Sequence, residues 1–327
     1  RPPISTLFPY TTLFRSFFPE GGDLVVGLPS RVYFQALKPN GKPAELKGVV
    51  VDDTGAEVAR VESYHHGMGR FLIAPVAGHS YELRVTRPVG IDRRYRLPAA
   101  KASGVVMTVE DNSDGSDCRV DVYATEAMAG ATVIAARRDR VCAIQTLDLK
   151  AGANSVVLRP DSGQGVLRIT VLAADGIPLA ERLVYRGRGQ DMTVRITPDK
   201  DHYMPREKVV LTVKTTLPSG LPAPAELALA VVDDRVLTFA DDKTARILAH
   251  LYLEKDLPGE IVEPNFYLDP EEEKSPLALE LLMGTRGWRR FVWKQLENPG
   301  QWPDQQVPDQ LFPEVMAAEG RDRKSVV

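Results

Sequence analysis

The sequence contains the same turn-and-strand unit twice, about 180 residues apart. The first copy has a turn rich in Pro and Gly at residues 39–43, and a short apolar run that ends in two aspartates at 52–53. The second copy has the same kind of turn at 218–222 and a run that ends in aspartates at 233–234. A repeated unit of this kind predicts an array of similar β domains, and such arrays are usually structural or binding proteins.

Both ends of the chain are expected to be artefacts rather than native protein. Residues 6–16 and 322–327 read as translations of the two strands of one common sequencing adapter. Segments of such origin are left out of fold reasoning. We therefore expect residues 1–16 and 321–327 to be adapter, and the part between them to be a native fragment. A signal peptide or a further domain could lie beyond either cut.

Composition and charge exclude several classes of protein. A net charge of −3 lacks the basic surplus of a nucleic-acid-binding protein. The sequence contains no run of about 18 apolar residues, so no membrane-spanning helix is predicted. The native part, about 300 residues long, has room for two or three domains.

The chain has two cysteines, Cys118 and Cys142, which lie in neighbouring predicted strands. They could form a disulfide in an oxidising compartment, or they could be two small buried thiols. Neither cysteine has the spacing of a CxxC motif or of a metal site. The sequence leaves both alternatives open.

Short alternating runs bounded by Gly and Pro predict that residues 17–99 fold as an antiparallel β-sandwich. The run at 31–37, for example, alternates between one apolar and one polar face. Residues 100–189 repeat the pattern, with a strong turn cluster at 111–115. The sequence therefore predicts an all-β chain that begins with two sandwiches in tandem.

A third sandwich is predicted for residues 190–296, because the repeated turn and its flanking apolar runs lie there. This sandwich carries a helical insertion at about 241–284, where the apolar spacing changes to that of a helix. Residues 297–320 are rich in Pro, Gln and Asp, and we expect them to form a linker.

Two helices are predicted within this insertion. Asp241 or Asp242 is the expected N-cap of the first helix. The second helix is expected to begin at Ser275-Pro276, since Pro is favoured in the first turn of a helix. Gly284 is expected to stop it, because Gly is the usual residue just after a helix end.

No metal site is predicted from the histidines and aspartates. Neighbouring residues of a strand point to opposite faces, so His65 and His66 are expected not to share one ion, with or without His79. The paired aspartates at 52–53 and 233–234 close strands just before turns. Asp at such positions accepts backbone hydrogen bonds, so we expect structural roles for them.

No catalytic centre or cofactor site is predicted either. The glycines at 21–22 lack the following Lys-Ser/Thr of a phosphate loop. The sequence around Ser162 lacks the pattern of a nucleophile elbow. Five scattered histidines give no Ser/His/Asp set. We therefore expect a non-enzymatic protein that needs no cofactor.

The candidate interface is a run of aromatic and arginine residues, types that are enriched at interaction hot spots: Trp288, Arg289, Arg290, Phe291 and Trp293. In a strand, Trp288 and Arg290 would share one face and the other three residues the opposite face. Two interpretations stay open. The run is either a strand of the third sandwich with one buried face, or a docking surface for another domain of the same protein or for an envelope partner.

Several of these segments resemble macroglobulin-like domains of the α2-macroglobulin family. They are F-P-E-G-G at 18–22, H-G-M-G-R-F at 66–71 and D-H-Y-M-P-R-E-K-V at 201–209. In the last segment Arg206 stands where Gly is usual, which departs from the pattern. The resemblance implies tandem immunoglobulin-like or macroglobulin-like antiparallel sandwiches over nearly all of the native part.

Two further segments resemble a narrower group, with L-P-G-E-I-V-E-P at 257–264 and L-L-M-G-T-R-G-W-R-R-F at 281–291. That group consists of large Gram-negative envelope proteins, in which macroglobulin-like repeats often precede a plug-like domain akin to that of TonB-dependent receptors. The resemblance implies a non-enzymatic structural or binding segment outside the cytoplasm, in the periplasm or associated with the outer membrane. The implied partners are other domains of the same chain and envelope proteins.

Two alternatives stay open. The α2-macroglobulin family includes endopeptidase inhibitors, which trap proteases with a bait region and a Cys-Gly-Glu-Gln thioester. Cys118 is followed by Arg119 and Cys142 by Ala143, so neither cysteine has that context. A trap would need both elements beyond the cut ends. The second alternative is a carbohydrate-binding sandwich of a surface enzyme, which would need exposed aromatic platforms.

Overall fold

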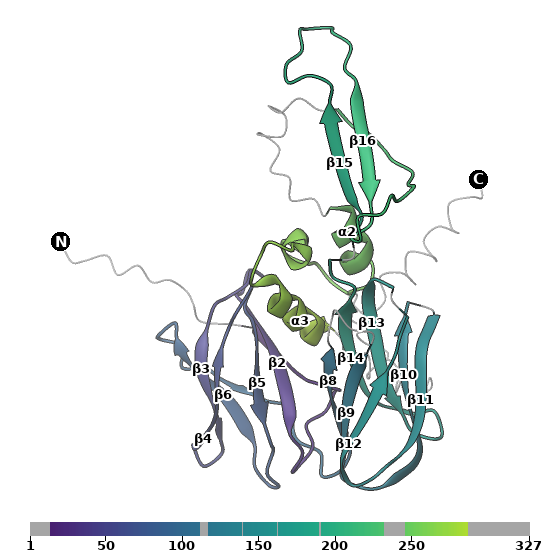
Figure 1. Cartoon of the computed structure of the whole chain (residues 1–327). Coiled ribbons are helices and arrows are strands. Elements are labelled where there is room, and N and C mark those ends of the chain that lie inside the picture. The colour runs from purple at the N-terminus through teal and green to yellow at the C-terminus, as the bar shows by residue number, and fades with distance from the viewer. Residues whose placement is uncertain are drawn as a thin grey trace, which may run out of the picture.

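The computed structural model describes residues 14–111, 117–138, 140–161, 163–189, 191–231 and 246–286. Most of its regular structure is antiparallel β-sheet, which confirms the predicted all-β class. Figure 1 shows two β-sandwiches side by side, helices packed over the seam between them, and a hairpin that projects away from both.

The first sandwich consists of two sheets. One sheet has the order β1-β2-β5, with β1 at Phe14–Pro19, β2 at Ser30–Leu37 and β5 at Met68–Ile73. The other has the order β4-β3-β6-β7, with β4 at Glu57–Glu62, β3 at Lys47–Asp52, β6 at Tyr81–Arg87 and β7 at Arg94–Arg96. The predicted alternation of β2 is confirmed, since Val32, Phe34 and Ala36 point into the core between the sheets.

The second sandwich also has two antiparallel sheets. The larger has the order β11-β10-β13-β14, with β11 at Arg140–Leu149, β10 at Met128–Arg137, β13 at Gly165–Leu172 and β14 at Pro178–Arg186. The smaller has the order β12-β9-β8, with β12 at Gly152–Leu158, β9 at Cys118–Ala124 and β8 at Val105–Asp111. Cys118 is fully buried in the core, and Cys142 packs against it from β11. Both cysteines are free thiols in the structure, with Cys118 buried and Cys142 half-buried, and their pairing stays a prediction.

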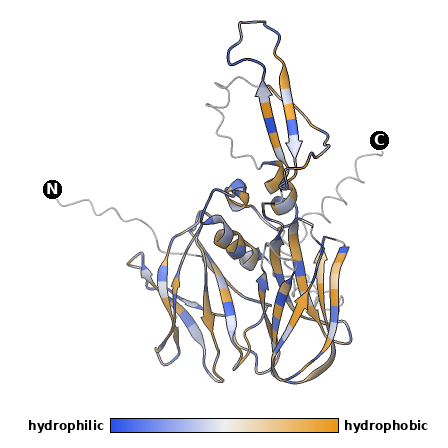
Figure 2. Ribbon diagram, in the orientation of Figure 1, coloured by the Kyte–Doolittle hydropathy of each residue, from blue (hydrophilic) through white to orange (hydrophobic). Residues whose placement is uncertain are grey.

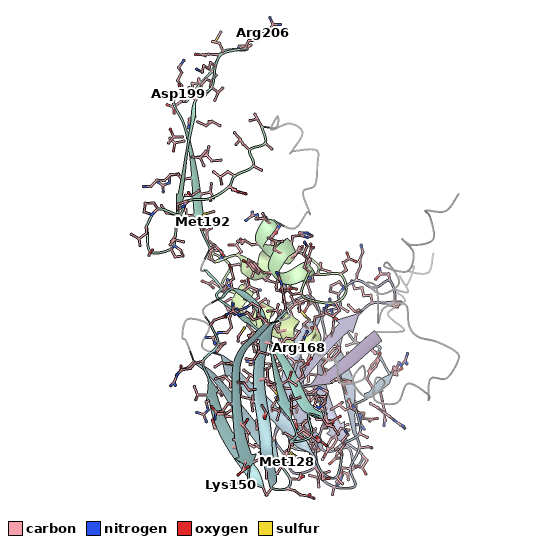
Figure 3. The ribbon with its side chains drawn as sticks, turned by 90° about the vertical axis from the view of Figure 1, so that its right-hand side faces the viewer. Met128, Lys150, Arg168, Met192, Asp199 and Arg206 are labelled. Carbon is pink, nitrogen blue, oxygen red and sulfur yellow. The ribbon has the colours of Figure 1, made fainter. Side chains whose placement is uncertain are left out.

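The hairpin of β15 (Thr193–Pro198) and β16 (Leu211–Thr216) is the described part of the predicted third sandwich. Figure 3 shows Met192 near its base, and Asp199 and Arg206 toward its far end. Most side chains of β15 and β16 are exposed. The boundaries predicted for the third sandwich stay a prediction.

The sequence repeat is also a structural repeat. Adding 179 to each residue number of the pair Phe18–Tyr33 in β1 and β2 gives the pair Thr197–Thr212 in β15 and β16. The turn that follows is also repeated. Lys38 N–H donates to the carbonyl of Lys42 at 2.7 Å, and Leu217 N–H donates to that of Leu221 at 2.9 Å. The hairpin is therefore the counterpart of β1 and β2.

Helices lie at the two predicted places, and a 3-10 helix between them was not predicted. All of them pack on the first two sandwiches rather than within a third. They are α2 at Ile247–Ala249, the π-helix η1 at His250–Glu254, the 3-10 helix η2 at Pro264–Leu268 and α3 at Ser275–Arg286. Their apolar side chains form one cluster with Tyr33 and Met68 of the first sandwich and with Leu183 and Tyr185 of the second. The expected N-caps Asp241 and Asp242 lie outside the described residues.

The prediction that Gly284 stops the second helix is wrong, because α3 continues to Arg286. A side-chain Cβ at Gly284 would lie only 2.3 Å from Cδ1 of Tyr33. The glycine is therefore present so that the helix backbone can lie directly against the Tyr33 ring. Its role is tertiary packing and not capping.

Candidate functional site

The strongest candidate site is a buried network of charged side chains at the seam, centred on Glu20 and Arg182. Glu20 follows β1, and its side chain has no exposed surface. Its carboxylate pairs with the guanidinium of Arg182 from β14 at 3.2 Å and with that of Arg31 from β2 at 3.3 Å. It also accepts a hydrogen bond from Val109 N–H in β8 at 3.2 Å. One carboxylate thus connects strands of both sandwiches.

Glu280 of α3 is the second acid of this network. Its carboxylate lies 3.2 Å from the guanidinium of Arg182 and 2.8 Å from that of Arg70 in β5. It also accepts a hydrogen bond from the hydroxyl of Tyr33. The Arg182 guanidinium lies over the Tyr33 ring, 4.5 Å from its centroid, which adds a cation–π contact. The network therefore joins the helix to both sandwiches.

The backbones of the two sandwiches also approach closely at this seam. Glu181 N–H of β14 donates to the carbonyl of Gly21 at 3.1 Å. Gly21 has φ 80°, and a Cβ there would lie 2.9 Å from the Met107 side chain. A larger residue would be strained in this conformation and would clash, so Gly21 serves close packing.

Burial and charge set the protonation of this network. Burial raises the pKa of Glu20, and the guanidinium groups of Arg182 and Arg31 act against that rise. Burial lowers the pKa of Arg182, but Tyr33, Glu20 and Glu280 together raise it above its ordinary value. Burial also raises the pKa of the Tyr33 hydroxyl, so this group stays protonated at neutral pH. The arginines remain charged and hold the carboxylates in place.

This geometry suits a joint better than a reaction centre. An acid or base must reach a proton of the substrate, and Glu20 has no exposed surface. Taking charges out of water is costly, so each member of such a network depends on its partners. The arrangement can therefore fix the relative positions of two sandwiches and a helix.

The two adjacent histidines lie elsewhere, where the first sandwich meets η2. Their rings are 4.0 Å apart, so the expectation that His65 and His66 point to opposite faces is wrong. The reason is that they form a turn and not a strand, with His66 at φ 46°. His65 stacks on Phe266 at 4.0 Å, and Nε2 of His66 lies 3.2 Å from a carboxylate oxygen of Glu263. These contacts are structural.

His65 makes stability depend on pH. Burial, followed by the neighbouring His66, lowers the pKa of His65 to about 4. Below its ordinary pKa the unfolded chain binds a proton that the folded chain excludes, so the free energy of unfolding falls as the pH drops from about 6.5 to about 4. We expect a loss of about 2 kcal/mol, allowing for partial exposure of the ring.

Denaturant titrations at several pH values would measure this effect. His65→Phe keeps a ring against Phe266 and should remove most of the loss, because it removes the titrating group. A matching change at the exposed His202 should leave the pH dependence as it is. An identical acid loss in His65→Phe would contradict the assignment.

The other predicted positions have structural roles or lie outside the described residues. Asp52 accepts hydrogen bonds from Thr54 N–H and from Ala56 N–H, both at 2.9 Å, which confirms its turn role. Its hydrogen bond from the Thr54 hydroxyl is the main cause that lowers the pKa of Asp52. The second aspartate pair, at 233–234, lies outside the described residues, and so do Trp288, Arg289, Arg290, Phe291 and Trp293.

A surface groove of about 420 Å³ lies beside the start of β3. Lys38, Lys47, Glu62, Ser63 and Arg87 contribute to its lining. Lys47 pairs with Glu62 across it, and the Ser63 hydroxyl donates to Glu45 at 2.7 Å. The Ser63 oxygen also accepts a hydrogen bond from Leu46 N–H at 2.7 Å, so these contacts tie the start of β3 to the end of β4.

Within the described residues, no group of three or more His, Cys, Asp or Glu side chains could hold a metal ion. None of the helices in the described ranges has the length and apolar character needed to cross a membrane.

The sequence did not predict the charged network, although the segment that contains Glu20 is one of those that resemble macroglobulin-like domains. Glu20, Arg182 and Glu280 are far apart in the chain, and no spacing rule connects them. The available signal was a lone acid, Glu20, between Pro19 and the glycines at 21–22. Charged residues are rarely fully buried unless they are paired, but the sequence does not show burial.

No family model matches the sequence, and no curated protein matches it. Among solved structures, the chain is similar to Salmonella alpha-2-macroglobulin reacted with methylamine, with 13% identity and a TM-score of 0.24 over 62% of this chain and 18% of that one. It is similar to invasin, a bacterial integrin-binding protein, with 15% identity and a TM-score of 0.26 over 64% of this chain and 47% of the invasin chain. It is also similar to the Escherichia coli adhesin FdeC, with 14% identity and a TM-score of 0.26 over 64% of this chain and 76% of the FdeC chain. The chain thus spans less than a fifth of the Salmonella protein's length.

Proposed function

We propose that the chain is a non-enzymatic structural and binding segment of a macroglobulin-like protein of a bacterial envelope, located outside the cytoplasm. The first two sandwiches act in it as one rigid spacer that carries the third unit. The observation that supports this role most is the buried network of Glu20, Arg182 and Glu280, which connects both sandwiches and α3. Other domains of the same chain and envelope proteins are the proposed partners.

Rigidity is useful to such a segment because a rigid spacer keeps a constant distance between the third unit and the rest of the envelope protein. Interfaces between domains of one chain usually permit relative motion unless they are large and apolar. Here the apolar side chains of α3 pack against apolar side chains of both sandwiches at the seam. The ion pairs of Glu20 and Arg182 also fix the positions of the two sandwiches relative to each other. The two sandwiches are therefore expected to move as one body.

Fractionation of the source cells tests the proposed location. An antibody raised against this chain should detect the full-length protein in the envelope or periplasmic fraction. Recovery in the cytosol, alongside a cytosolic marker enzyme, would contradict the proposal. Sequencing of the native gene across residues 16–17 and 320–321 distinguishes the narrower forms of the proposal. A plug-like domain would support an outer-membrane scaffold, whereas a Cys-Gly-Glu-Gln thioester would favour an endopeptidase inhibitor.

A further inference from the structure

The β15–β16 hairpin has a bare apolar face. In antiparallel pairs, residues directly opposite each other lie on the same face, so Val194 and Ile196 share a face with Leu211 and Val213. Val194 and Ile196 are about half exposed. Figure 2 shows the hydrophobic positions along the projecting hairpin, well clear of the two sandwiches. A lone two-stranded hairpin is only marginally stable, so this face needs a cover.

The first sandwich shows what its counterpart requires. With the same offset of 179 in residue number, Leu211 and Val213 of β16 correspond to Val32 and Phe34 of β2. Val32 and Phe34 are completely buried. In that sandwich β2 pairs with β1 on one edge and with β5 on the other. Thr216 of β16 bridges to Pro222, just as Leu37 of β2 bridges to Pro43. Among the described residues, β15 is the only named strand that pairs with β16, so the edge of residues 211–214 on the side that corresponds to β5 is open.

The segment after α3 resembles β5 in sequence. Residues 67–73 read G-M-G-R-F-L-I, and residues 287–293 read G-W-R-R-F-V-W. Adding 220 aligns the glycine, the arginine and the phenylalanine as identical residues, and aligns Leu72 with Val292. In β5, Phe71 and Ile73 point into the core beside β2. Their counterparts are Phe291 and Trp293.

We propose that residues 288–293 pair with the open edge of β16 as the third-unit counterpart of β5. The register follows from that of the first sandwich, where Tyr33 lies opposite Arg70 and Val32 opposite Phe71. The counterparts are Thr212 opposite Arg290 and Leu211 opposite Phe291. Phe291 and Trp293 then extend the apolar face of the hairpin, and Arg290 lies on its polar face.

The segment begins beside the helices that lie below the hairpin. The last residue of α3, Arg286, donates to the carbonyls of Pro258 and Glu260, in the loop that follows η1. Both Figure 1 and Figure 3 place the helices that include η1 beneath the base of the hairpin. The base is the end of β16 at Thr216, and Trp288 would lie opposite Lys214 near it. At about 3.3 Å per residue, the seven residues 287–293 are about 23 Å long when extended, which is enough to run along the six residues of β16.

Cysteine cross-linking of the full chain tests the register. Thr212→Cys combined with Arg290→Cys places two thiols opposite each other on the polar face, within the reach of a disulfide. Mild oxidation should then produce an intramolecular disulfide, identified by peptide mapping. The matched control combines Thr212→Cys with Arg289→Cys, which points to the opposite face and should form at least about tenfold less of the bond.

Three results would overturn the proposal. One is the absence of a cross-link in the Thr212–Arg290 pair, and another is an equal yield in the control pair. The third is a cross-link that forms only between two chains, which would mean that a second copy covers the edge. Cys118 and Cys142 are present in every variant, so any disulfide that they form is subtracted through the unmodified chain.

Tryptophan fluorescence gives an independent readout, because all three tryptophans of the chain lie beyond residue 287. If the segment covers the hairpin, Ile196→Asp on the apolar face should shift the emission to longer wavelength. Thr197→Asp on the polar face of the same strand should not. An emission spectrum that is unchanged in Ile196→Asp, while the far-ultraviolet spectrum remains native, would contradict the docking.

Discussion

Replacing Arg182 with methionine is expected to lower the free energy of unfolding by about 3–5 kcal/mol. Methionine keeps much of the apolar stem but removes the guanidinium, and it leaves the buried carboxylate of Glu20 without its closest charged partner. The cation–π contact with Tyr33 is lost as well. Urea denaturation, followed by circular dichroism, measures the change.

The control is Arg60→Met, which removes an arginine of similar size from an exposed pair with Glu57. Exposed ion pairs contribute little, so its midpoint should equal that of the unchanged protein. Glu20→Gln in the Arg182→Met background should cost much less than Glu20→Gln alone, because residues of one network are coupled. Strictly additive effects would mean that Glu20 and Arg182 do not stabilise each other.

Gly284→Ala is expected to destabilise the protein by about 2 kcal/mol, through overpacking against Tyr33. The added Cβ would lie 2.3 Å from the Tyr33 ring, so α3 has to shift away from the seam. In a helix interior the same change normally stabilises by about 1 kcal/mol. A loss of stability in Gly284→Ala therefore indicates that α3 is docked against Tyr33, and a gain indicates that it is not. The melting temperature from thermal unfolding measures this change.

Pro276→Ala serves as the comparison, because Pro276 is exposed in the first turn of α3. Its effect should be small. If Gly284→Ala raised the melting temperature instead, α3 would not lie against Tyr33, and the seam described above would be wrong.

Local patterns in the sequence predicted most of the sandwich strands correctly. Alternation identified the buried face of β2, and the repeated turn identified a structural repeat with a constant offset. The turn is determined by residues close together in the sequence, and the alternation is determined by the two faces of a single strand. They can therefore be read without knowledge of the partner strands.

Tertiary contacts explain where the sequence rules failed. The rule for helix ends assigned Gly284 to a cap, whereas contact with Tyr33 decides its role. The rule for strand faces separated His65 from His66, although a turn with positive φ brings their rings together. The partners of Glu20 come from β2, β8 and β14, and no local pattern connects these strands.

Differential scanning calorimetry tests the central claim that the two sandwiches and α3 form one cooperative unit. We expect one main transition for this unit, with a calorimetric enthalpy equal to the van't Hoff enthalpy. Arg182→Met should lower the midpoint of this transition, because that change weakens the joint between the sandwiches. Two separate transitions in the unchanged protein, one for each sandwich, would contradict the claim.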